Sequence, residues 1–402
     1  MEPDQIRKQP NTISSRGRWL TLTEIGPTYD EKRAEVAIIA ALLHDVGHGP
    51  FSHTFETVQQ SLGVRKHHEK WTAEIIRNTS GAIQPLLETY WSEGGFCDAV
   101  ADLLEAEDPT DIYHAVVSSS FDADRLDYLR RDRLMTGTGA GAIDFDWLME
   151  NVRVGKIAIE APDGDGDEHS VKVETFCIDM KALPAAEQFL LARYTLHEQV
   201  YFHKTTRCIE HMIAKLLGLI AEHAAQPTSV AQTGLDISHP LISFFKPDNS
   251  NLTTYLALDD VVITGALEEL SKASDIRIAD LAERLRNRHL YKTLDVAATF
   301  GYDPGVQVAK VRWINKKFSE KLACKTVILD EGASINIYTQ IGGDDERAHK
   351  KLHILDPKEG PVEITKMSSI IRPLSEAKKK FTRYYFESGS DRNHASPAKG
   401  EI

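Results

Sequence analysis

Three histidines and an aspartate fall within ten residues of one another in the stretch Ala40–Glu56, which reads AALLHDVGHGPFSHTFE. The uncharged run Val36–Leu43 before them predicts a buried helix, and the glycines and proline that follow are residues that end helices. His44 and Asp45, at that helix end, can offer an imidazole nitrogen and a carboxylate oxygen to one cation. Such a mixed set suits borderline or hard divalent metal ions. The alternative is a helix end with incidental histidines.

A second polar segment, FDADRLDYLRRD, runs from Phe121 to Asp132. On a helix, Asp124, Tyr128 and Asp132 are four residues apart and share one stripe. The two aspartates on that stripe would repel each other, so a cation or several arginines nearby would relieve the cost. The alternative is a solvated charged face with ion pairs between successive turns.

A third segment, FLLARYTLHEQVYFHK, lies in a long helical region predicted over residues 182–223. Arg193, His197 and Tyr201 recur every four residues, and Lys204 follows three residues later. One helix face would therefore present a guanidinium, an imidazole, a phenol and an ammonium group, which suits an anionic ligand. The alternative is the ordinary wet side of a helix.

The three segments, in this order, resemble the HD-domain phosphohydrolases, and within them the deoxynucleoside triphosphate (dNTP) triphosphohydrolases. The resemblance covers about residues 35–300. It implies a mainly α fold, a divalent metal ion (Mn, Mg, Fe, Co or Zn), and attack at the α-phosphorus of a dNTP that releases a deoxynucleoside and triphosphate. Alternatives are an HD phosphohydrolase for another nucleotide or single-stranded nucleic acid, or a catalytically weak nucleotide-binding or assembly protein.

The resemblance also implies a role for individual residues. The metal ligands are expected to be His44, Asp45 and Asp124, and the catalytic residues His48, His53, Glu56 and His68. Histidine titrates near neutral pH, and Glu56 lies within helical reach of His53, so His53 is the expected general acid. The family often has Asp where this chain has Glu56. The expected substrate-binding residues are Arg125, Tyr128, Asp132, Arg193, His197, Tyr201 and Lys204.

Within that set, Arg125, Arg193 and Lys204 are expected to hold the triphosphate, because arginine binds phosphates bidentately. Tyr201 is expected under the sugar, where a 2′-hydroxyl would crowd it. Members of the family can also be activated by nucleotides bound between subunits. Basic residues that roughly match such a site are Arg153, Lys181, Arg288 and Lys292, and the alternative is ordinary surface charge.

One departure from the family concerns the metal site, which in relatives has a further His in an N-terminal helix. No His precedes His44 in this chain. The chain as written is therefore expected to bind metal more weakly, with a loss of about 10–100-fold, and to have reduced activity. Ile38, Ile39 or Leu42 should then be more exposed than in a core helix.

Composition sets further bounds. The chain has 402 residues, ordinary hydrophobic and charged fractions of 42% and 27%, and a net charge of −13. This charge argues against a general nucleic-acid coat but leaves room for an anionic small substrate in a local basic pocket. Four scattered cysteines are typical of reduced thiols. With a polar N-terminus and no long apolar run, a cytoplasmic protein without a membrane span is expected. The resemblance to the HD-domain phosphohydrolases further implies a homo-oligomer.

The fold class expected is mainly α, with an HD-domain helical core, an inserted β-hairpin and a small α+β C-terminal lobe. An irregular arm is expected at 1–30, the HD core at 31–225 with the hairpin at about 152–178, the C-terminal lobe at 226–387, and a disordered tail at 388–402. Helices are expected at 31–47, 52–62 with Ser52 as N-cap, 67–77, about 255–272 and 276–289. From Val306 onward the pattern, beginning with VAKVRW, predicts mostly strands.

Overall fold

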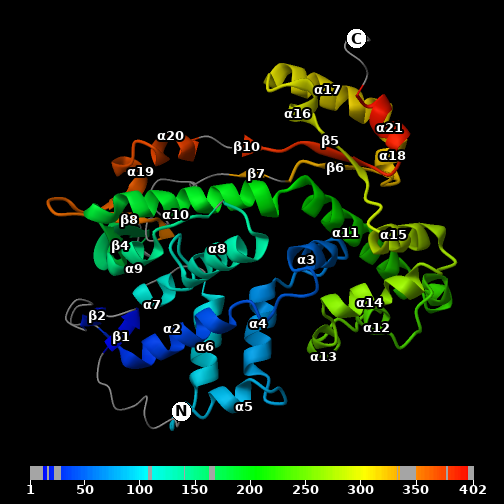
Figure 1. Ribbon diagram of the computed structural model, residues 1–402. Coiled ribbons are helices and arrows are strands. Elements are labelled where there is room, and N and C mark those ends of the chain that lie inside the picture. The colour runs from blue at the N-terminus through cyan, green and yellow to red at the C-terminus, as the bar shows by residue number, and fades with distance from the viewer. Residues whose placement is uncertain are drawn as a thin grey trace. The chain divides into compact units, whose positions relative to one another are not determined.

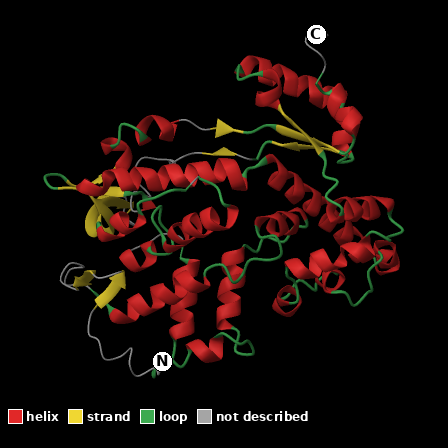
Figure 2. Cartoon of the chain, in the orientation of Figure 1, coloured by secondary structure: helices red, strands yellow, loops and turns green. Residues whose placement is uncertain are grey.

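The computed structural model describes residues 12–15, 18–21, 29–106, 111–139, 141–162, 168–332, 334–335, 350–376 and 379–396. Most of these residues are helical, and the strands are short apart from one long hairpin (Figures 1 and 2). The mainly α prediction is confirmed. Among the described residues, no helix combines the length and the apolar character needed to cross a membrane.

The chain forms two compact units, and each is assembled from three separate segments. The first unit comprises Met1–His44, Ile76–Gln199 and Asn336–Lys378, and the second comprises Asp45–Ile75, Val200–Ile335 and Lys379–Ile402. One change of unit falls between His44 and Asp45. These units do not run along single stretches of the chain, as the domains expected from the sequence do. The expected domain boundaries stay predictions.

In the first unit, helix α2 packs against α6 and α7, and α8 packs against α10 (Figure 1). Asp30 caps α2 by accepting a hydrogen bond from the Arg33 backbone N–H. The helices of this unit are α2 (Glu31–Leu43), α5 (Gln84–Leu87), α6 (Phe96–Glu105), α7 (Ile112–Ala115), α8 (Ala123–Thr136), α9 (Phe145–Glu150), α10 (Leu183–Leu196), α19 (Ile364–Met367) and α20 (Ile371–Glu376). Helix α4 (His68–Arg77) begins in the second unit and ends in the first.

A four-stranded sheet also belongs to the first unit, in the order β3-β4-β8-β9. Its strands are β3 (Val152–Pro162), β4 (Glu168–Asp179), β8 (His353–Asp356) and β9 (Gly360–Glu363). Strands β3 and β4 form the expected antiparallel hairpin, while β8 joins β4 in parallel. A further antiparallel pair, β1 (Thr12–Ser15) with β2 (Arg18–Thr21), corrects the prediction that the whole N-terminal arm is irregular.

The second unit is built around α11 (Lys204–Ala224), the longest of the described helices. Its apolar face packs against α3 (His53–Ser61), α12 (Pro240–Phe245) and α15 (Ile276–Arg286), and α14 (Asp260–Leu270) packs on α15. Phe55, Trp71, Leu216 and Phe244 are fully buried in this core. The short helix α13 (Leu252–Leu256) adds Tyr255 to it.

The C-terminal part of the second unit has a three-stranded antiparallel sheet in the order β5-β11-β6. The strands are β5 (Lys292–Asp295), β11 (Arg383–Phe386) and β6 (Val327–Asp330), and β7 (Ser334–Ile335) pairs with β10 (Lys379–Lys380). The associated helices are α16 (Val296–Phe300), α17 (Pro304–Lys317), α18 (Ser319–Ala323) and α21 (Gly389–His394).

Two predictions in this region are wrong. The strand expected at VAKVRW is part of α17, which Asp303 caps by accepting from the Val306 N–H at 2.8 Å and which Pro304 begins. The tail expected to be disordered from residue 388 contains α21, because Ala395 is fully buried in a small apolar core beside it. Residues 397–402 of that prediction lie outside the described residues.

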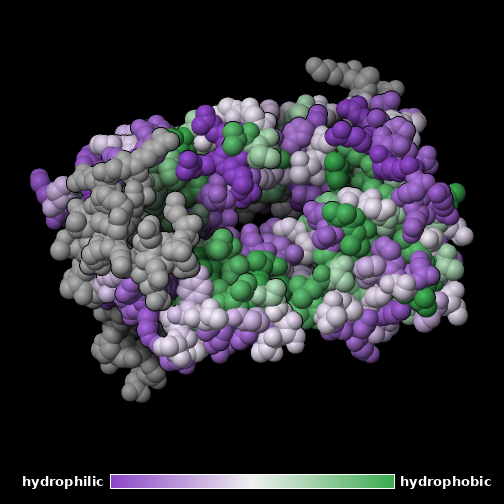
Figure 3. All heavy atoms as spheres, turned by 60° about the horizontal axis from the view of Figure 1, so that its bottom comes forward, coloured by the Kyte–Doolittle hydropathy of each residue, from purple (hydrophilic) through white to green (hydrophobic). Residues whose placement is uncertain are grey.

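Helix α2 buries one face only. Val36, Ala37 and Ala40 are buried, whereas Ile38 and Leu42 are 61% and 74% exposed. The expected exposure is confirmed for these two residues, and Ile39 is half-buried. Apolar side chains gather in patches on the face of the molecule drawn in Figure 3.

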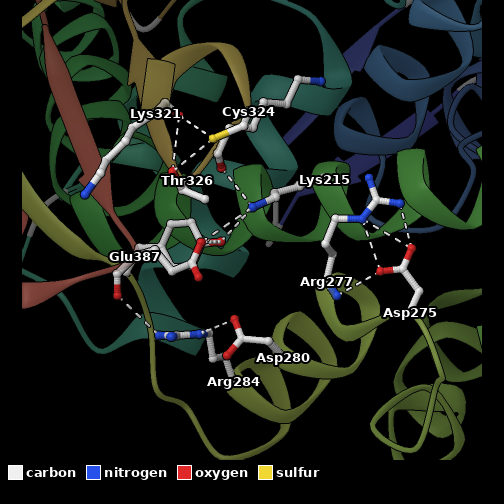
Figure 4. Close-up of polar contacts among 11 residues, drawn as sticks. Lys215, Asp275, Arg277, Asp280, Arg284, Lys321, Cys324, Thr326 and Glu387 are labelled. Atoms are coloured by element: carbon white, nitrogen blue, oxygen red, sulfur yellow. Dashed lines mark hydrogen bonds and ion pairs between the residues drawn. The ribbon is translucent and has the colours of Figure 1, made fainter. Parts of the chain in front are cut away.

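Polar side chains join α11 and α15 to the three-stranded sheet of the second unit (Figure 4). The Lys215 ammonium donates to the Lys325 carbonyl at 2.8 Å and to the Tyr291 hydroxyl at 3.1 Å. Arg284 pairs with Asp280 at 2.6 Å and donates to the Glu387 backbone carbonyl at 3.4 Å. Burial lowers the pKa of Lys215, although the nearby Glu387 carboxylate opposes this shift.

Candidate active site

The loop between α2 and α3 has a strained backbone. Phe51 and Ser52 both adopt positive φ, at 55° and 52°, which costs a non-glycine residue about 1–3 kcal/mol. Ser52 occupies the N-cap position of α3, but its side chain does not cap the helix. Instead its hydroxyl lies 3.1 Å from Nδ1 of His48, so the predicted capping role is corrected to a contact with a candidate catalytic histidine.

Gly47 fixes the first part of this loop. Its N–H donates to the Thr72 hydroxyl at 3.0 Å, and its carbonyl accepts from the Tyr255 hydroxyl at 2.7 Å. A Cβ at this position would lie 2.2 Å from the Thr72 backbone nitrogen and 2.4 Å from the His68 carbonyl oxygen. The close approach of α4 to the loop therefore requires glycine. Tyr255 in turn stacks on Trp71, with ring centroids 4.0 Å apart.

Three histidines of the second unit form a cluster. His48, His53 and His68 each offer a ring nitrogen within 4.8 Å of the others. The His48 and His68 rings stack, with centroids 3.9 Å apart and an interplanar angle of 15°. The sequence analysis named all three as candidate catalytic residues, and the fold brings them together.

Glu56 connects the histidines of this cluster. Its carboxylate oxygens lie 3.2 Å from Nδ1 of His53, 2.9 Å from Nδ1 of His67 and 3.7 Å from Nδ1 of His68. The contact with His53 was predicted from the helical spacing. The contact between Glu56 and His67 was not predicted, although the adjacent histidines His67 and His68 were a visible signal in the sequence. The carboxylate can therefore hold the His53 ring in one orientation.

The ionisation of these groups is set by the cluster itself. Burial would raise the pKa of Glu56, but the hydrogen bonds with His53 and His67 outweigh it and the pKa is lowered. Burial, followed by the charge of His48, lowers the pKa of His68. At neutral pH the cluster thus combines a charged carboxylate with a neutral His68 imidazole.

His44 and Asp124 come together in the first unit. His44 caps the C-terminus of α2, Asp124 lies in the first turn of α8, and Nε2 of His44 is 3.5 Å from Oδ1 of Asp124. Nδ1 of His44 hydrogen-bonds to the Ala41 carbonyl at 2.9 Å, so it carries the ring proton and Nε2 presents a lone pair.

This geometry fits a metal ion. An ion bonded to both atoms at about 2.1 Å with tetrahedral angles would set them about 3.4 Å apart. Asp45, the third expected ligand, directly follows His44 and begins the second unit, where its Oδ1 lies 3.3 Å from Nε2 of His48. Its participation in metal binding stays a prediction.

Arg193, Tyr128 and His197 form a cluster in the same unit as His44 and Asp124. Arg193 of α10 acts on Tyr128 of α8 through its charge and a hydrogen bond, both of which oppose the rise in the pKa of Tyr128 caused by burial. His197 hydrogen-bonds through Nδ1 to the Arg193 carbonyl at 3.1 Å, and burial, with the Arg193 charge, lowers the pKa of His197 to about 4. His197 is therefore neutral here, and the guanidinium supplies the positive charge.

Arg193 also has a polar atom that points to an anionic ligand. Its Nε is buried and has no hydrogen-bond partner among the described residues. A buried charged donor without a partner is costly, and arginine recognises phosphate through paired N–H groups. The first unit therefore has an arginine suited to bind a phosphate oxygen.

Arg125 has a competing structural role. Its Nη1 donates to the Ser119 carbonyl at 2.5 Å and pairs with Asp122, whose carboxylate caps α8 by accepting from the Arg125 N–H at 2.8 Å. Burial raises the pKa of Asp122 to about 6, although Arg125 opposes this. The sequence analysis missed Asp122, which its position just before the helix could have revealed. Further along α8, Oδ1 of Asp132 lies 3.5 Å from Nη1 of Arg131, so the two side chains form an ion pair.

The predicted uniform stripe from Arg193 to Lys204 is wrong in its geometry. Helix α10 ends at Leu196, a π-helix follows over His197–Tyr201, and α11 begins at Lys204 with His203 as its N-cap. The wider π turn breaks the four-residue spacing, and such turns are frequent at functional sites. Tyr201 and Lys204 belong to the second unit, and their roles in substrate binding stay predictions.

The four basic residues of the expected activator site divide between the units. In the first, Arg153 donates to the carbonyls of Glu150 and Val152 at 3.0 and 2.8 Å, and Lys181 lies over the Trp147 ring at 5.4 Å. Arg288 and Lys292 belong to the second unit. The activator site stays a prediction.

Two segments of the chain match known protein families. Residues 15–129 match the HD domain, and residues 168–234 match the HD associated region. The uncharacterized protein YwfO of Bacillus subtilis is 26% identical over 365 residues, which cover 90% of this chain and 75% of that protein. A phosphohydrolase from Bacteroides thetaiotaomicron has the same fold, with a TM-score of 0.65 and 24% identity over 91% of this chain and 84% of that one.

A third relative has a described activity in its name. The deoxynucleoside triphosphate triphosphohydrolase SAMHD1 homolog of Dictyostelium discoideum is 28% identical over 308 residues. The match covers 73% of this chain but only 49% of that protein. The chain therefore spans about half the length of this relative.

Proposed function

Because the chain carries an HD domain followed by the HD associated region, we propose that it is a metal-dependent phosphohydrolase that converts dNTPs to deoxynucleosides and triphosphate. The observation that carries the proposal is the pairing of His44 with Asp124. The two ligand atoms are 3.5 Å apart, and the histidine proton is held on the nitrogen that faces away. The name of the Dictyostelium relative supports the choice of dNTPs as substrates.

His44 and Asp124, with Asp45 next in the chain, are the residues that would hold the ion. A divalent ion at such a site polarises a phosphate oxygen and lowers the pKa of a bound water. Arg193 would bind phosphate oxygens through its guanidinium, whose Nε is buried, and Tyr128 would orient that guanidinium. His197 is neutral at pH 7, so Arg193 would supply the positive charge for the phosphates.

The remaining requirement is a proton for the leaving group. When water attacks the α-phosphorus, the bond between phosphorus and the 5′-oxygen breaks, and that oxygen must gain a proton to leave as a hydroxyl. His53, oriented by the Glu56 carboxylate, is the proposed donor, with His48 and His68 beside it. Since His48 follows His44 by four residues, the chain keeps their Cα atoms within about 14 Å of each other.

A second candidate function is nucleotide binding with weak or no turnover. The exposure of Ile38 and Leu42 on α2, the helix that ends at His44, favours it. An HD phosphohydrolase acting on another nucleotide or on single-stranded nucleic acid is a further alternative within enzymes. Activation by a nucleotide at Arg153, Lys181, Arg288 and Lys292 in an oligomer also remains a proposal.

The deciding experiment incubates the full chain with dNTPs and ribonucleotides in Mn²⁺, Mg²⁺ or Co²⁺ and separates the products by HPLC. Deoxynucleoside and triphosphate are expected from dNTPs. Asp124→Ala should abolish turnover and reduce bound metal. The matched control is Asp127→Ala, because Asp127 lies on the same helix, is exposed and, within the described part of the chain, forms an ion pair with surface Arg131. Binding of dNTPs without any product would favour the second candidate.

A further inference from the structure

The candidate catalytic loop is held at two points by one distant segment of the second unit. The Tyr255 hydroxyl donates to the Gly47 carbonyl at 2.7 Å, and the Asp260 carboxylate accepts from the Phe51 N–H at 2.7 Å. These partners are 208 and 209 residues apart in the sequence. The two contacts thus fall on either side of His48.

The loop has reason to need such support. Phe51 and Ser52 both have positive φ, a conformation that side chains disfavour and that persists only where the surroundings enforce it. The Ser52 hydroxyl does not cap α3, so the helix start does not hold the loop through its usual side-chain bond. The Phe51 N–H to Asp260 bond is a long-range contact to the strained residue itself, in addition to the local bond from the Thr54 N–H to the Phe51 carbonyl at 3.1 Å.

The half-buried Phe51 side chain packs against the apolar core of the second unit, so packing also supports the loop. The loop residues His48, Gly49 and Pro50 line an open pocket of about 260 Å³ together with Leu258, Asp259 and Asp260. At this pocket the Phe51 backbone N–H is held by the Asp260 carboxylate. At the other point Tyr255 is anchored firmly, because its ring is buried and stacked on Trp71. One clamp point is therefore buried, and the other is an exposed hydrogen bond to a charged carboxylate.

We propose that Tyr255 and Asp260 are positioning residues that set the loop conformation and thereby the placement of His48 and His53. The inference rests on the proposed function, since it assigns the loop a part in phosphate-ester hydrolysis. Each residue reaches the loop through a backbone group, the Gly47 carbonyl for Tyr255 and the Phe51 N–H for Asp260, so each acts through the loop and takes no part in proton transfer.

The test compares Tyr255→Phe and Asp260→Ala with the unmodified full chain. Tyr255→Phe keeps the ring stacked on Trp71 and removes only the hydroxyl. Each substitution should lower kcat for dNTP hydrolysis by about 10- to 100-fold, since a small displacement of catalytic groups is costly, while KM changes less than about twofold. Asp260→Asn keeps an oxygen that can accept from Phe51 and should restore most of kcat.

Asp259→Ala is the matched control. Asp259 begins the same helix and lines the same pocket, but it accepts from the Val262 N–H and so caps α14. Its loss should lower the melting temperature without changing kcat. If Asp259→Ala lowers kcat as much as Asp260→Ala does, the effect belongs to the stability of α14 and the proposal is overturned.

A readout independent of turnover is amide hydrogen exchange of the peptide that contains residues 46–53, followed by mass spectrometry. Faster exchange in Tyr255→Phe and Asp260→Ala, with slow exchange kept in Asp260→Asn and Asp259→Ala, supports the clamp even if the chain hydrolyses no dNTP. Unchanged exchange in Tyr255→Phe and Asp260→Ala would overturn it even if the chain is active.

Discussion

A single carboxylate, that of Glu56, lies within hydrogen-bonding distance of His53 and His67 and close to His68. Its pKa is lowered by the histidine hydrogen bonds, so it is charged throughout the range in which histidine titrates. A charged acceptor fixes both the tautomer and the orientation of an imidazole better than a neutral one does.

Glu56→Gln is therefore expected to lower kcat by about 10–100-fold while the bound metal stays the same. The glutamine amide is nearly isosteric but cannot accept through both of its terminal atoms. The measurement is steady-state turnover together with metal analysis of the purified protein. His67→Ala serves as the control, since it leaves the contact between His53 and Glu56 in place. If Glu56→Gln keeps its full rate, His53 needs no carboxylate partner.

Arg193 should show a conflict between activity and stability. Its buried Nε has no partner among the described residues, so the free protein bears a desolvation cost that a bound phosphate would relieve. Arg193→Met should raise KM for the substrate by at least about tenfold and leave the melting temperature unchanged or higher. Arg131→Ala, which removes an exposed cation from a surface ion pair, should leave both KM and the melting temperature unchanged. A clear loss of stability in Arg193→Met would identify Arg193 as a structural residue.

Which site residues could be predicted depended on how local their signals were. His44, Asp45 and His48 stand close together in the sequence, and Asp124 follows a helical spacing, so their residue types suggested metal and acid–base chemistry. Tyr255 and Asp260 gave no such signal, because their roles arise from contacts with residues over 200 positions away. Asp122 could have been found as an N-cap, but its pairing with Arg125 depends on the fold.

At the scale of elements, the helical period identified most of the helices but not where they change character. The run VAKVRW also fits an alternating strand pattern, and only Asp303 and Pro304 before it indicate a helix start. The π-helix at His197–Tyr201 could not be predicted, because its extra residue per turn has no consistent signal in residue type.

The fit of α4 against the candidate catalytic loop predicts a strong effect of Gly47→Ala. The added Cβ would meet backbone atoms of Thr72 and His68, which cannot move aside as a side chain can. A destabilisation of about 1–3 kcal/mol is expected, with loss of activity. Gly218→Ala is the matched control. Gly218 lies inside α11 with open space around it, so alanine should stabilise the protein by about 0.5–1 kcal/mol. Urea unfolding of both variants makes the comparison, and equal stabilities would contradict the proposed close approach.

The contact between α11 and β6 predicts a dependence of stability on pH. Asp330 is buried and accepts from Arg207 at 2.9 and 3.0 Å, with His211 at 3.4 Å. Burial alone would raise its pKa, but the bonds from His211 and Arg207 outweigh it and hold the pKa of this carboxyl well below its usual range. A lowered pKa stabilises the folded state above the unfolded-state pKa of about 3.9, and this stabilisation is lost as the pH falls toward the folded-state value.

Asp330→Asn should therefore cost about 3 kcal/mol at pH 7, because half-buried Arg207 loses its buried counter-charge and keeps its pairing with the more exposed Glu210 at 2.7 Å. The gap between the variant and the unmodified chain should narrow as the pH falls below about 4. Urea unfolding measured from pH 3 to 7 tests this. A gap that stays constant over that range would mean that the carboxylate charge contributes nothing to the difference.

At the scale of the whole molecule, the two units are interleaved along the chain. The segment that matches the HD domain, residues 15–129, contributes to both units, and the chain changes unit within the His44-Asp45 pair itself. Composition and local pattern predict contiguous lobes, because they contain no information about which distant segments return to complete a core. The fold class could therefore be predicted, whereas the arrangement of segments could not.

The sheet order β5-β11-β6 has a consequence for how the protein is made. Strand β11 is the middle strand, yet it is the last of the three to leave the ribosome, by more than fifty residues after β6. Until then β5 and β6 lack the partner that lies between them, and unpaired strand edges promote aggregation of nascent chains. The second unit can therefore finish folding only after β11 has left the ribosome. Ribosome stalling before residue 383 would leave a chain that depends on chaperones to stay soluble.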